Sequence, residues 1–181
     1  MTKSTERKAL AEATPENHPI LDPDLLEFRT AKKIKHLIAK PMQDILKDKT
    51  IVHKFLLASM EGEQVLKTNS MVCIGNEDDA WQQEPATLLK KYNVTGYTDD
   101  GWAICEPKPE NENWACQIPE DHPPFSVICL WGREFMVDGQ QVFLLFGKPG
   151  DYVLRSKTDP NDVWIVDQKL FRSTYEIEGD D

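Results

Sequence analysis

The chain has 181 residues, of which 31 are acidic and 21 are basic, so its formal net charge at pH 7 is −10. Non-specific nucleic-acid binding depends on lysine and arginine, so this balance argues against a nucleic-acid partner and favours a protein with a basic surface. No apolar run approaches the length of a membrane span, and no signal peptide is visible at the N-terminus. We therefore expect a globular, cytoplasmic protein that does not associate with membranes.

The N-terminal part of the chain is expected to contain an arm and a helix. Residues 1–20 are mainly polar and interrupted by prolines, which predicts a flexible arm, and residues 21–181 are expected to form a single globular domain. Asp22-Pro23-Asp24 begins the helix, with an N-cap aspartate, a proline in the first turn and a second acid near the positive end of the dipole. Apolar residues follow at helical spacing, and Pro41 ends the helix.

Two later segments, about 51–95 and 131–178, resemble each other. The first opens with a predicted strand over 51–59. Setting Trp81 over Trp164 aligns four further positions in kind without a gap: Glu84 with Asp167, Leu88 with Phe171, Tyr92 with Tyr175 and Val94 with Ile177. The alternative is a chance match of common core residues. We interpret the similarity as an internal duplication of a strand–turn–strand–helix–strand unit.

The second copy of this unit gives the clearest local signals. Pro149-Gly150-Asp151 has the composition of a tight turn, and the apolar runs that follow it predict a hairpin of strands. Asp167 is placed as the N-cap of a short helix that extends to Thr174. A last strand, 175–177, completes the unit.

The segment between the copies predicts strands and one long loop. A turn and a short strand cover 98–105, and the prolines of 106–113 argue against a regular element there. Phe125 to Trp131 is predicted as a buried strand, 132–134 as a turn, and 142–146 as another strand. Together these elements predict an α+β fold of mainly antiparallel β-structure, with an internal duplication and an N-terminal helix, arranged as a small barrel or sandwich.

No metal, cofactor or catalytic motif is apparent in the sequence. The four cysteines, Cys73, Cys105, Cys116 and Cys129, have no zinc-binding spacing, and free thiols are the leading interpretation, with a Cys105–Cys116 disulfide as the alternative. Phosphate-binding glycine loops and the common hydrolase motifs are absent. Acidic clusters lie in turns; two of them facing each other could hold a divalent cation, but none has EF-hand spacing. We expect no cofactor, no metal and no catalytic residues.

Five residues are the candidates for binding a ligand or partner. Trp102 and Trp131 lie outside the matching positions of the duplicated unit and are the better candidates for a groove wall, while His122, Lys148 and Asp151 are the polar candidates. The repeated aromatic residues fit a core, although a pair of stacking pockets for a planar ligand or a methylated cation is the alternative.

The C-terminal motif resembles a known family. Gly147-Lys148-Pro149-Gly150-Asp151-Tyr152, followed by a tryptophan strand and Phe171 to Glu176, resembles the PGDYG family of uncharacterised proteins and similar small phage-borne proteins. The likeness covers about the last thirty residues, and Val153 stands where the signature has its final glycine. The resemblance implies a recurring fold unit and supplies no catalytic residues.

These observations favour a non-catalytic binding or interaction protein whose partner is a protein with a basic surface or an unidentified small molecule. One alternative is a small hydrolase or transferase acting on a nucleotide or a modified protein, with His122, Cys116, Lys148 and Asp151 as its best groups. Another is a phage or pathogen protein that blocks a basic site of its host. Both a monomer and a homodimer are compatible with the sequence.

Overall fold

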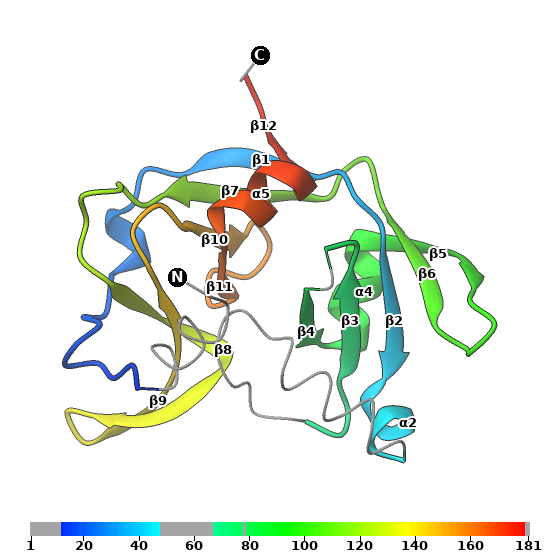
Figure 1. Cartoon of the computed structure of the whole chain (residues 1–181), viewed down its shortest axis with the longest axis horizontal. Helices are drawn as coiled ribbons and strands as arrows, with labels where there is room; N and C mark the ends of the chain where they lie inside the picture. The colour runs from blue at the N-terminus through cyan, green and yellow to red at the C-terminus, as the bar shows by residue number, and fades with distance from the viewer. Residues whose placement is uncertain (1–11, 48–66, 78, 180–181) are drawn as a thin grey trace. The chain divides into compact units, whose positions relative to one another are not determined.

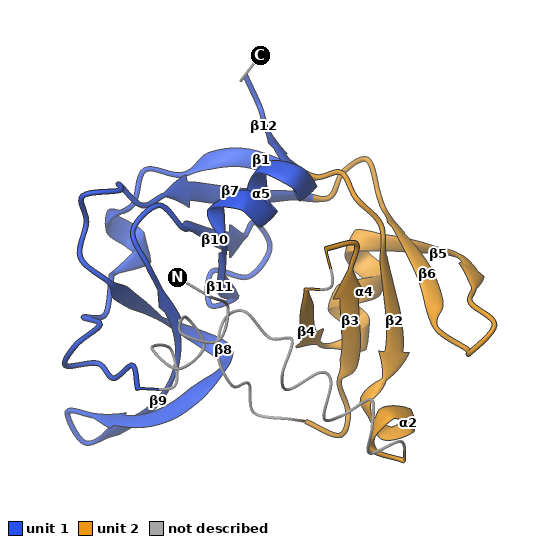
Figure 2. Ribbon diagram, in the orientation of Figure 1, with its two compact units in different colours: residues 1–32, 61–65, 112–181 blue, residues 33–60, 66–111 orange. Residues whose placement is uncertain are grey.

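The fold was obtained as a computed structural model, which describes residues 12–47, 67–77 and 79–179 (Figure 1). Its regular structure is mainly antiparallel sheet with short helices, which confirms the α+β class. The chain divides into two compact units (Figure 2). Unit 1 comprises 1–32, 61–65 and 112–181, and unit 2 comprises 33–60 and 66–111.

Unit 2 is built on a five-stranded sheet. In sheet order the strands are β4 (Ala80–Gln83), β3 (Met71–Gly75), β2 (Leu37–Pro41), β6 (Ala103–Pro107) and β5 (Tyr92–Tyr97). Side chains alternate between the faces of a sheet, so adjacent residues of β3 enter different cores. Cys73 packs with Leu88 of helix α4 (Pro85–Lys91), whereas Val72 packs with Met42 of helix α2 (Met42–Leu46). The sheet therefore has one helix on each face.

Unit 1 contains a second five-stranded sheet and a separate two-stranded ribbon. In sheet order the strands are β11 (Val163–Val166), β10 (Tyr152–Ser156), β7 (Glu112–Gln117), β1 (Arg29–Lys33) and β12 (Tyr175–Ile177). The ribbon consists of β8 (Phe125–Val137) and β9 (Gln140–Gly147). Helix α5 (Gln168–Thr174) packs Phe171 against Tyr152, with the two rings stacked at 3.7 Å between centroids. Val153, next to Tyr152, enters the other core with residues of the ribbon.

The two sheets share the order of their elements. In each, a hairpin is followed by a short helix and then by a strand at the opposite edge: β3–β4–α4–β5 in unit 2 and β10–β11–α5–β12 in unit 1. Both helices end in the same way, because the Tyr92 N–H donates to the Leu88 carbonyl and the Tyr175 N–H to the Phe171 carbonyl. The strand beside the last one differs in origin: it is β6 in unit 2, but in unit 1 it is β1, from the start of the chain.

The predicted N-terminal helix is wrong. Asp22 does accept the Asp24 N–H, but it caps only a 3₁₀ turn, η1 (Pro23–Leu25), and the chain then forms β1 and β2. Buried positions in β2 alternate, as at Leu37 and Ala39, which is the period of a strand. Pairing of β1 with β7, and of β2 with β3 and β6, overrides the local helix signal.

The turn predicted at 132–134 is also wrong, because β8 continues through it. The ladder with β9 shifts register between Ile128 and Arg133, and the hairpin turns at Asp138 and Gly139, both with positive φ. Glycine is needed at position 132 for its small size and not for a positive φ, because a Cβ there would lie 2.2 Å from the Leu144 carbonyl oxygen. The chain needs a close backbone approach at this position.

Three other sequence expectations concern the loop over 106–113, the N-terminal arm and the strand over 51–59. The irregular loop expected over 106–113 is shorter, since β6 extends to Pro107 and β7 begins at Glu112. The described part of the expected N-terminal arm lies on unit 1, where Ile20 bridges Ser126 and the Ser126 hydroxyl donates to the His18 carbonyl. The strand expected over 51–59 lies outside the described residues.

Candidate functional site around Lys148

The turn between β9 and β10 brings together two of the five candidate residues. Gly150 has a φ of +87°, and the Asp151 N–H donates to the Lys148 carbonyl, so the chain reverses tightly at Pro149-Gly150. The buried carboxylate of Asp151 accepts from the Lys148 backbone N–H at 3.0 Å and from its Nζ at 2.9 Å. Ile118 fixes the turn from outside by exchanging backbone hydrogen bonds with Gly150 and Asp151.

Asp167 completes this cluster from the start of α5. Its Oδ1 caps the helix by accepting the N–H groups of Lys169 at 2.9 Å and Leu170 at 3.4 Å, as the sequence predicts for an N-cap. Its other oxygen, Oδ2, lies 2.7 Å from Lys148 Nζ. The sequence identified Asp167 as a cap but gave no signal of this contact, since the pairing joins two separate turns. We call Lys148, Asp151 and Asp167 the Lys148 cluster.

The three charges of the Lys148 cluster shift one another's pKa values. Burial lowers the pKa of Lys148, but attraction to the two carboxylates outweighs it, and the net pKa is raised. Burial raises the pKa of Asp151 in spite of the lysine. Asp167 also loses solvation, yet the Lys148 ammonium and the capped N–H groups hold its pKa below the ordinary value. Lys148 therefore stays protonated and is unsuited to act as a base or nucleophile.

Polar neighbours of the Lys148 cluster add two hydrogen bonds around the turn. Gln117 Nε2 donates to the Gly150 carbonyl at 3.2 Å, and Gln168 Nε2 donates to Glu120 Oε1 at 3.3 Å. The resulting network joins the ends of β7 and β9 to α5. Together with the Lys148–Asp167 contact, these bonds hold the turn against the helix.

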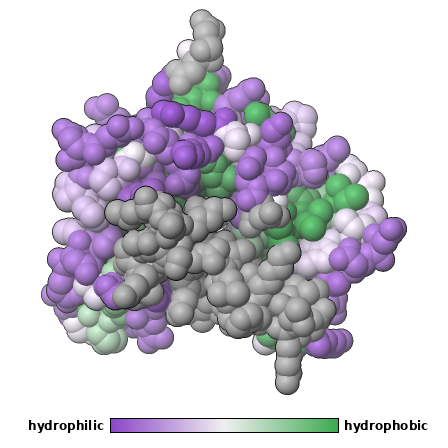
Figure 3. All heavy atoms as spheres, in the orientation of Figure 1, coloured by the Kyte–Doolittle hydropathy of each residue, from purple (hydrophilic) through white to green (hydrophobic). Residues whose placement is uncertain are grey.

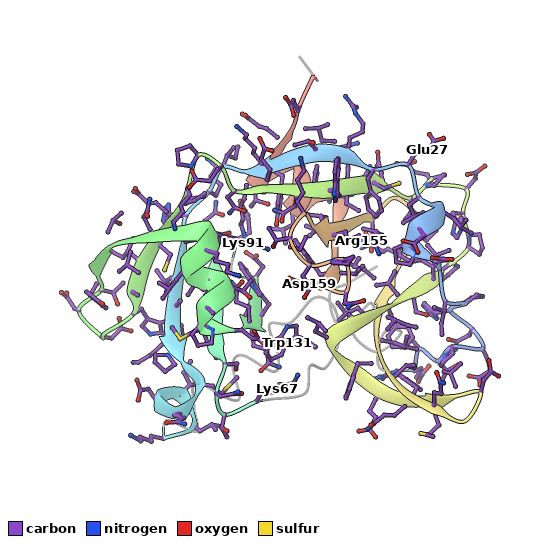
Figure 4. The ribbon with its side chains drawn as sticks, turned by 180° about the vertical axis from the view of Figure 1, so that it is seen from behind. Glu27, Lys67, Lys91, Trp131, Arg155 and Asp159 are labelled. Atoms are coloured by element: carbon purple, nitrogen blue, oxygen red, sulfur yellow. The ribbon has the colours of Figure 1, made fainter. Side chains whose placement is uncertain are left out.

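The other three candidates are placed by other contacts. Trp102 is only 4% exposed and packs in the core of unit 2 with Met42 and α2. The His122 Nδ1 is 2.7 Å from the Pro123 carbonyl, and the imidazole meets the Phe125 ring edge-on. Trp131 is half-buried on β8 (Figure 4).

The four cysteines, all in the described part of the chain, form no disulfide. Complete burial raises the pKa of Cys73 to about 12. Burial also raises the pKa of Cys105 and of Cys116, the latter being the cysteine considered as a nucleophile. A raised pKa lowers the thiolate fraction at neutral pH, so these thiols are less reactive than an ordinary cysteine.

The repeated aromatic residues belong to the cores of the two units. Tyr92 and Tyr175 are buried, and Tyr175 stacks on Phe171 at 4.9 Å between centroids. A cation does face Trp81, but it is the chain's own Lys33, whose Nζ is 4.2 Å from the ring centroid. The arrangement suits packing within the chain.

A half-exposed tryptophan that the sequence did not single out, Trp114, lies on the face of the unit 1 sheet opposite to α5. Lys157 Nζ is 4.2 Å from the Trp114 ring centroid and 3.3 Å from Glu112, whose pKa the lysine lowers. On the next strand, Arg155 binds Asp24 at 2.8 Å; Arg155 and Asp159 are marked in Figure 4. Both basic residues therefore have an acidic partner within the chain.

In the described residues, no group of three or more histidine, cysteine or acidic side chains is placed to hold a metal ion. The same residues include no helix with the length and apolar character needed to cross a membrane.

Comparison with known proteins gives no relative: no family model, no curated protein and no solved structure matches this chain.

Proposed function

We propose that this chain is a non-catalytic, cytoplasmic protein that acts by binding another molecule. The observation that carries the proposal is the state of its potentially reactive groups. Lys148 is held protonated between two carboxylates, and the pKa of Cys116 is raised by burial. Each shift lowers nucleophilic reactivity, whereas active sites shift pKa values toward the working pH.

The proposed partner is a protein with a basic surface. The net charge of −10 supports this choice, because opposite charge speeds encounter and discourages the wrong partners. A small-molecule ligand is the second possible partner, and a thermal-shift screen tests for it. No observation favours the hydrolase, the transferase or the host-blocking protein over the binding protein.

We further propose that the two units arose by internal duplication and that the C-terminal unit is related to the PGDYG family. The shared order of hairpin, helix and strand supports the duplication. The β-register supports it as well, since Trp81 pairs with Cys73 of β3 and Trp164 pairs with Leu154 of β10 at corresponding positions. Support for the family rests on the motif from Gly147 to Tyr152.

Thiol chemistry tests the non-catalytic proposal. We expect iodoacetamide to modify Cys116 slowly at neutral pH, with a rate that rises through pH 9, and to leave Cys73 unmodified until the protein unfolds. Mass spectrometry of each cysteine peptide between pH 6 and 10 measures both, and the protein in denaturant supplies the unperturbed rate. A Cys116 that reacts faster in the folded protein than in denaturant, with a midpoint below pH 7, would overturn the proposal.

A thermal-shift screen against nucleotides, divalent metals and common metabolites tests for small molecules. A ligand present at a hundred times its Kd adds about 2.7 kcal/mol to the free energy of unfolding, which shifts the melting temperature by several degrees. A hit that the protein leaves chemically unchanged fits a binding protein. A hit that is converted to product contradicts the proposal.

A further inference from the structure

Strand β5 is the most open edge of the two five-stranded sheets that the structure describes. It ends the unit 2 sheet and pairs there with β6. Its six residues have one buried, one intermediate and four exposed positions. The edge strands β4, β11 and β12 are shorter and less exposed. Open edges present backbone groups that another strand can bind.

The backbone of Val94 faces this open edge. The Lys108 N–H donates to the Lys91 carbonyl at 2.9 Å, which fixes which residues of β5 are hydrogen-bonded to β6. Residues alternate in an antiparallel ladder, so Asn93, paired with Glu106, also faces β6, and Val94 faces away. The register shift of the ladder lies immediately after this position, between Val94 and Gly96. Val94 therefore offers a donor and an acceptor to a second strand.

Apolar side chains accompany this edge. Val94 and Tyr97 pair with Cys105 and Ala103, which belong to the core cluster on the α4 face, so both side chains lie on that face. Val94 is 41% exposed and Tyr97 is 71% exposed. A group of apolar atoms is visible over the part of unit 2 that carries β5 and β6, within a mainly hydrophilic surface (Figure 3). A strand added here would cover apolar surface as well as backbone.

The charged residues that flank β5 favour one identity for the added strand. Exposed Lys90 precedes the strand, and exposed Asp99 follows it. An antiparallel pairing of two β5 strands places Lys90 of each copy toward Asp99 of the other, whereas a parallel pairing opposes like charges. We propose that β5 is a homodimer interface, in which two copies of this chain join their unit 2 sheets edge to edge and antiparallel.

The expected dimer is weak. One short strand per copy buries less than the roughly 1,200 Å² of a stable interface, and a net charge of −10 on each copy opposes association. Dimerisation should therefore depend on protein concentration, in the micromolar to millimolar range. The inference does not depend on the proposed function, because a binding protein and an enzyme are equally able to dimerise.

Sedimentation equilibrium of the full chain at physiological salt, over a wide range of concentration, measures the dimer Kd. Val94→Pro removes the outward N–H at a position where an edge strand tolerates proline, and we expect at least a tenfold rise in Kd with unchanged circular dichroism. A wild-type chain that stays monomeric into the millimolar range overturns the proposal. A folded Val94→Pro variant that dimerises as well as the wild type overturns it too.

Charge reversal at exposed positions tests the same interface without a risk to folding. Lys90→Glu and Asp99→Lys should each weaken the dimer by about fivefold, since each contact occurs twice. Combining the two reversals should restore the wild-type Kd. Lys47→Glu, at the exposed C-cap of α2, makes the same change in net charge outside β5 and serves as the control. Equal weakening by Lys47→Glu and Lys90→Glu, or no recovery in the double variant, contradicts the proposal.

Discussion

Asp167 has two roles, and a single substitution would not separate their contributions to the free energy of unfolding. Its Oδ1 caps α5, and its Oδ2 binds Lys148. A cap and an ion pair contribute separately to the free energy of unfolding, because an amide retains the acceptor oxygen but not the charge. Replacing the carboxylate in two different ways therefore separates them.

We expect Asp167→Ala to lower the free energy of unfolding by about 1–2 kcal/mol, because it removes the cap of α5 as well as one partner of Lys148. Asp167→Asn keeps an acceptor for the Lys169 N–H and should cost less. Urea denaturation of both variants measures the difference. Equal losses in the two variants would show that the cap contributes nothing.

The charge of Asp167 also predicts a pH dependence. Its pKa lies below the ordinary value of 3.8 in the folded protein, so the unfolded state binds the proton more readily. The ionised group therefore stabilises the fold at neutral pH, and this contribution disappears as the pH falls through the folded-state pKa. The difference in free energy of unfolding between the wild type and Asp167→Asn should be largest at pH 7 and should decrease below about pH 4. Urea titrations from pH 7 to pH 3 test it, and a difference that increases in acid would contradict it.

Among the elements, those with complete local signals were predictable from sequence. The hairpin at 152–166 and helix α5 follow from a turn motif and an N-cap, and both form as expected. Strands β1 and β2 were missed because their partners, β7, β3 and β6, come later in the chain. The same reason explains the site: Lys148 with Asp151 is a contact within one turn, whereas the Asp167 contact and the burial of Trp102 depend on tertiary packing.

The course of β8 gives a prediction at this scale. Gly132→Ala would place a Cβ against the Leu144 carbonyl of β9, and backbone cannot move aside as a flexible side chain does. We expect a loss of about 1–3 kcal/mol in the free energy of unfolding, as for other overpacked sites. Gly96→Ala, whose Cβ would meet Ile104 Cδ1 at an ordinary 3.8 Å, is the matched control and should be nearly neutral. Thermal and urea unfolding measure both, and equal effects would exclude the steric explanation.

At the scale of the whole molecule, the order of the chain couples the two units. Unit 2 lies between β1 and β7 in sequence, and these two strands pair with each other in unit 1. A folded unit 2 holds its own ends in fixed positions, whereas an unfolded unit 2 is a long flexible loop. Closing such a loop costs about 2–3 kcal/mol more than closing a short one.

A core substitution in unit 2 should therefore also weaken unit 1. Leu88→Ala empties part of the core beneath α4, so we expect Cys73 to become exposed at a lower urea concentration. We expect the urea concentration that half-exposes Cys129 of unit 1 to fall as well. Pulsed alkylation with mass spectrometry follows both thiols in one experiment. Phe143→Leu, a milder substitution in unit 1, shows how each thiol responds to a direct effect. A Cys129 midpoint unaffected by Leu88→Ala would mean that the units are independent.

Strand β12 is the last of the described strands and lies beside β1 in the unit 1 sheet, and just after it the Glu178 N–H donates to the Thr30 carbonyl. On the ribosome, β1 emerges before every strand of the unit 2 sheet, and all of those strands emerge well before β12 is made. The unit 2 sheet can thus form while synthesis continues. The sheet of unit 1 must wait until β12 has been made, so a chain truncated before β12 leaves β1 without the neighbour that completes its sheet.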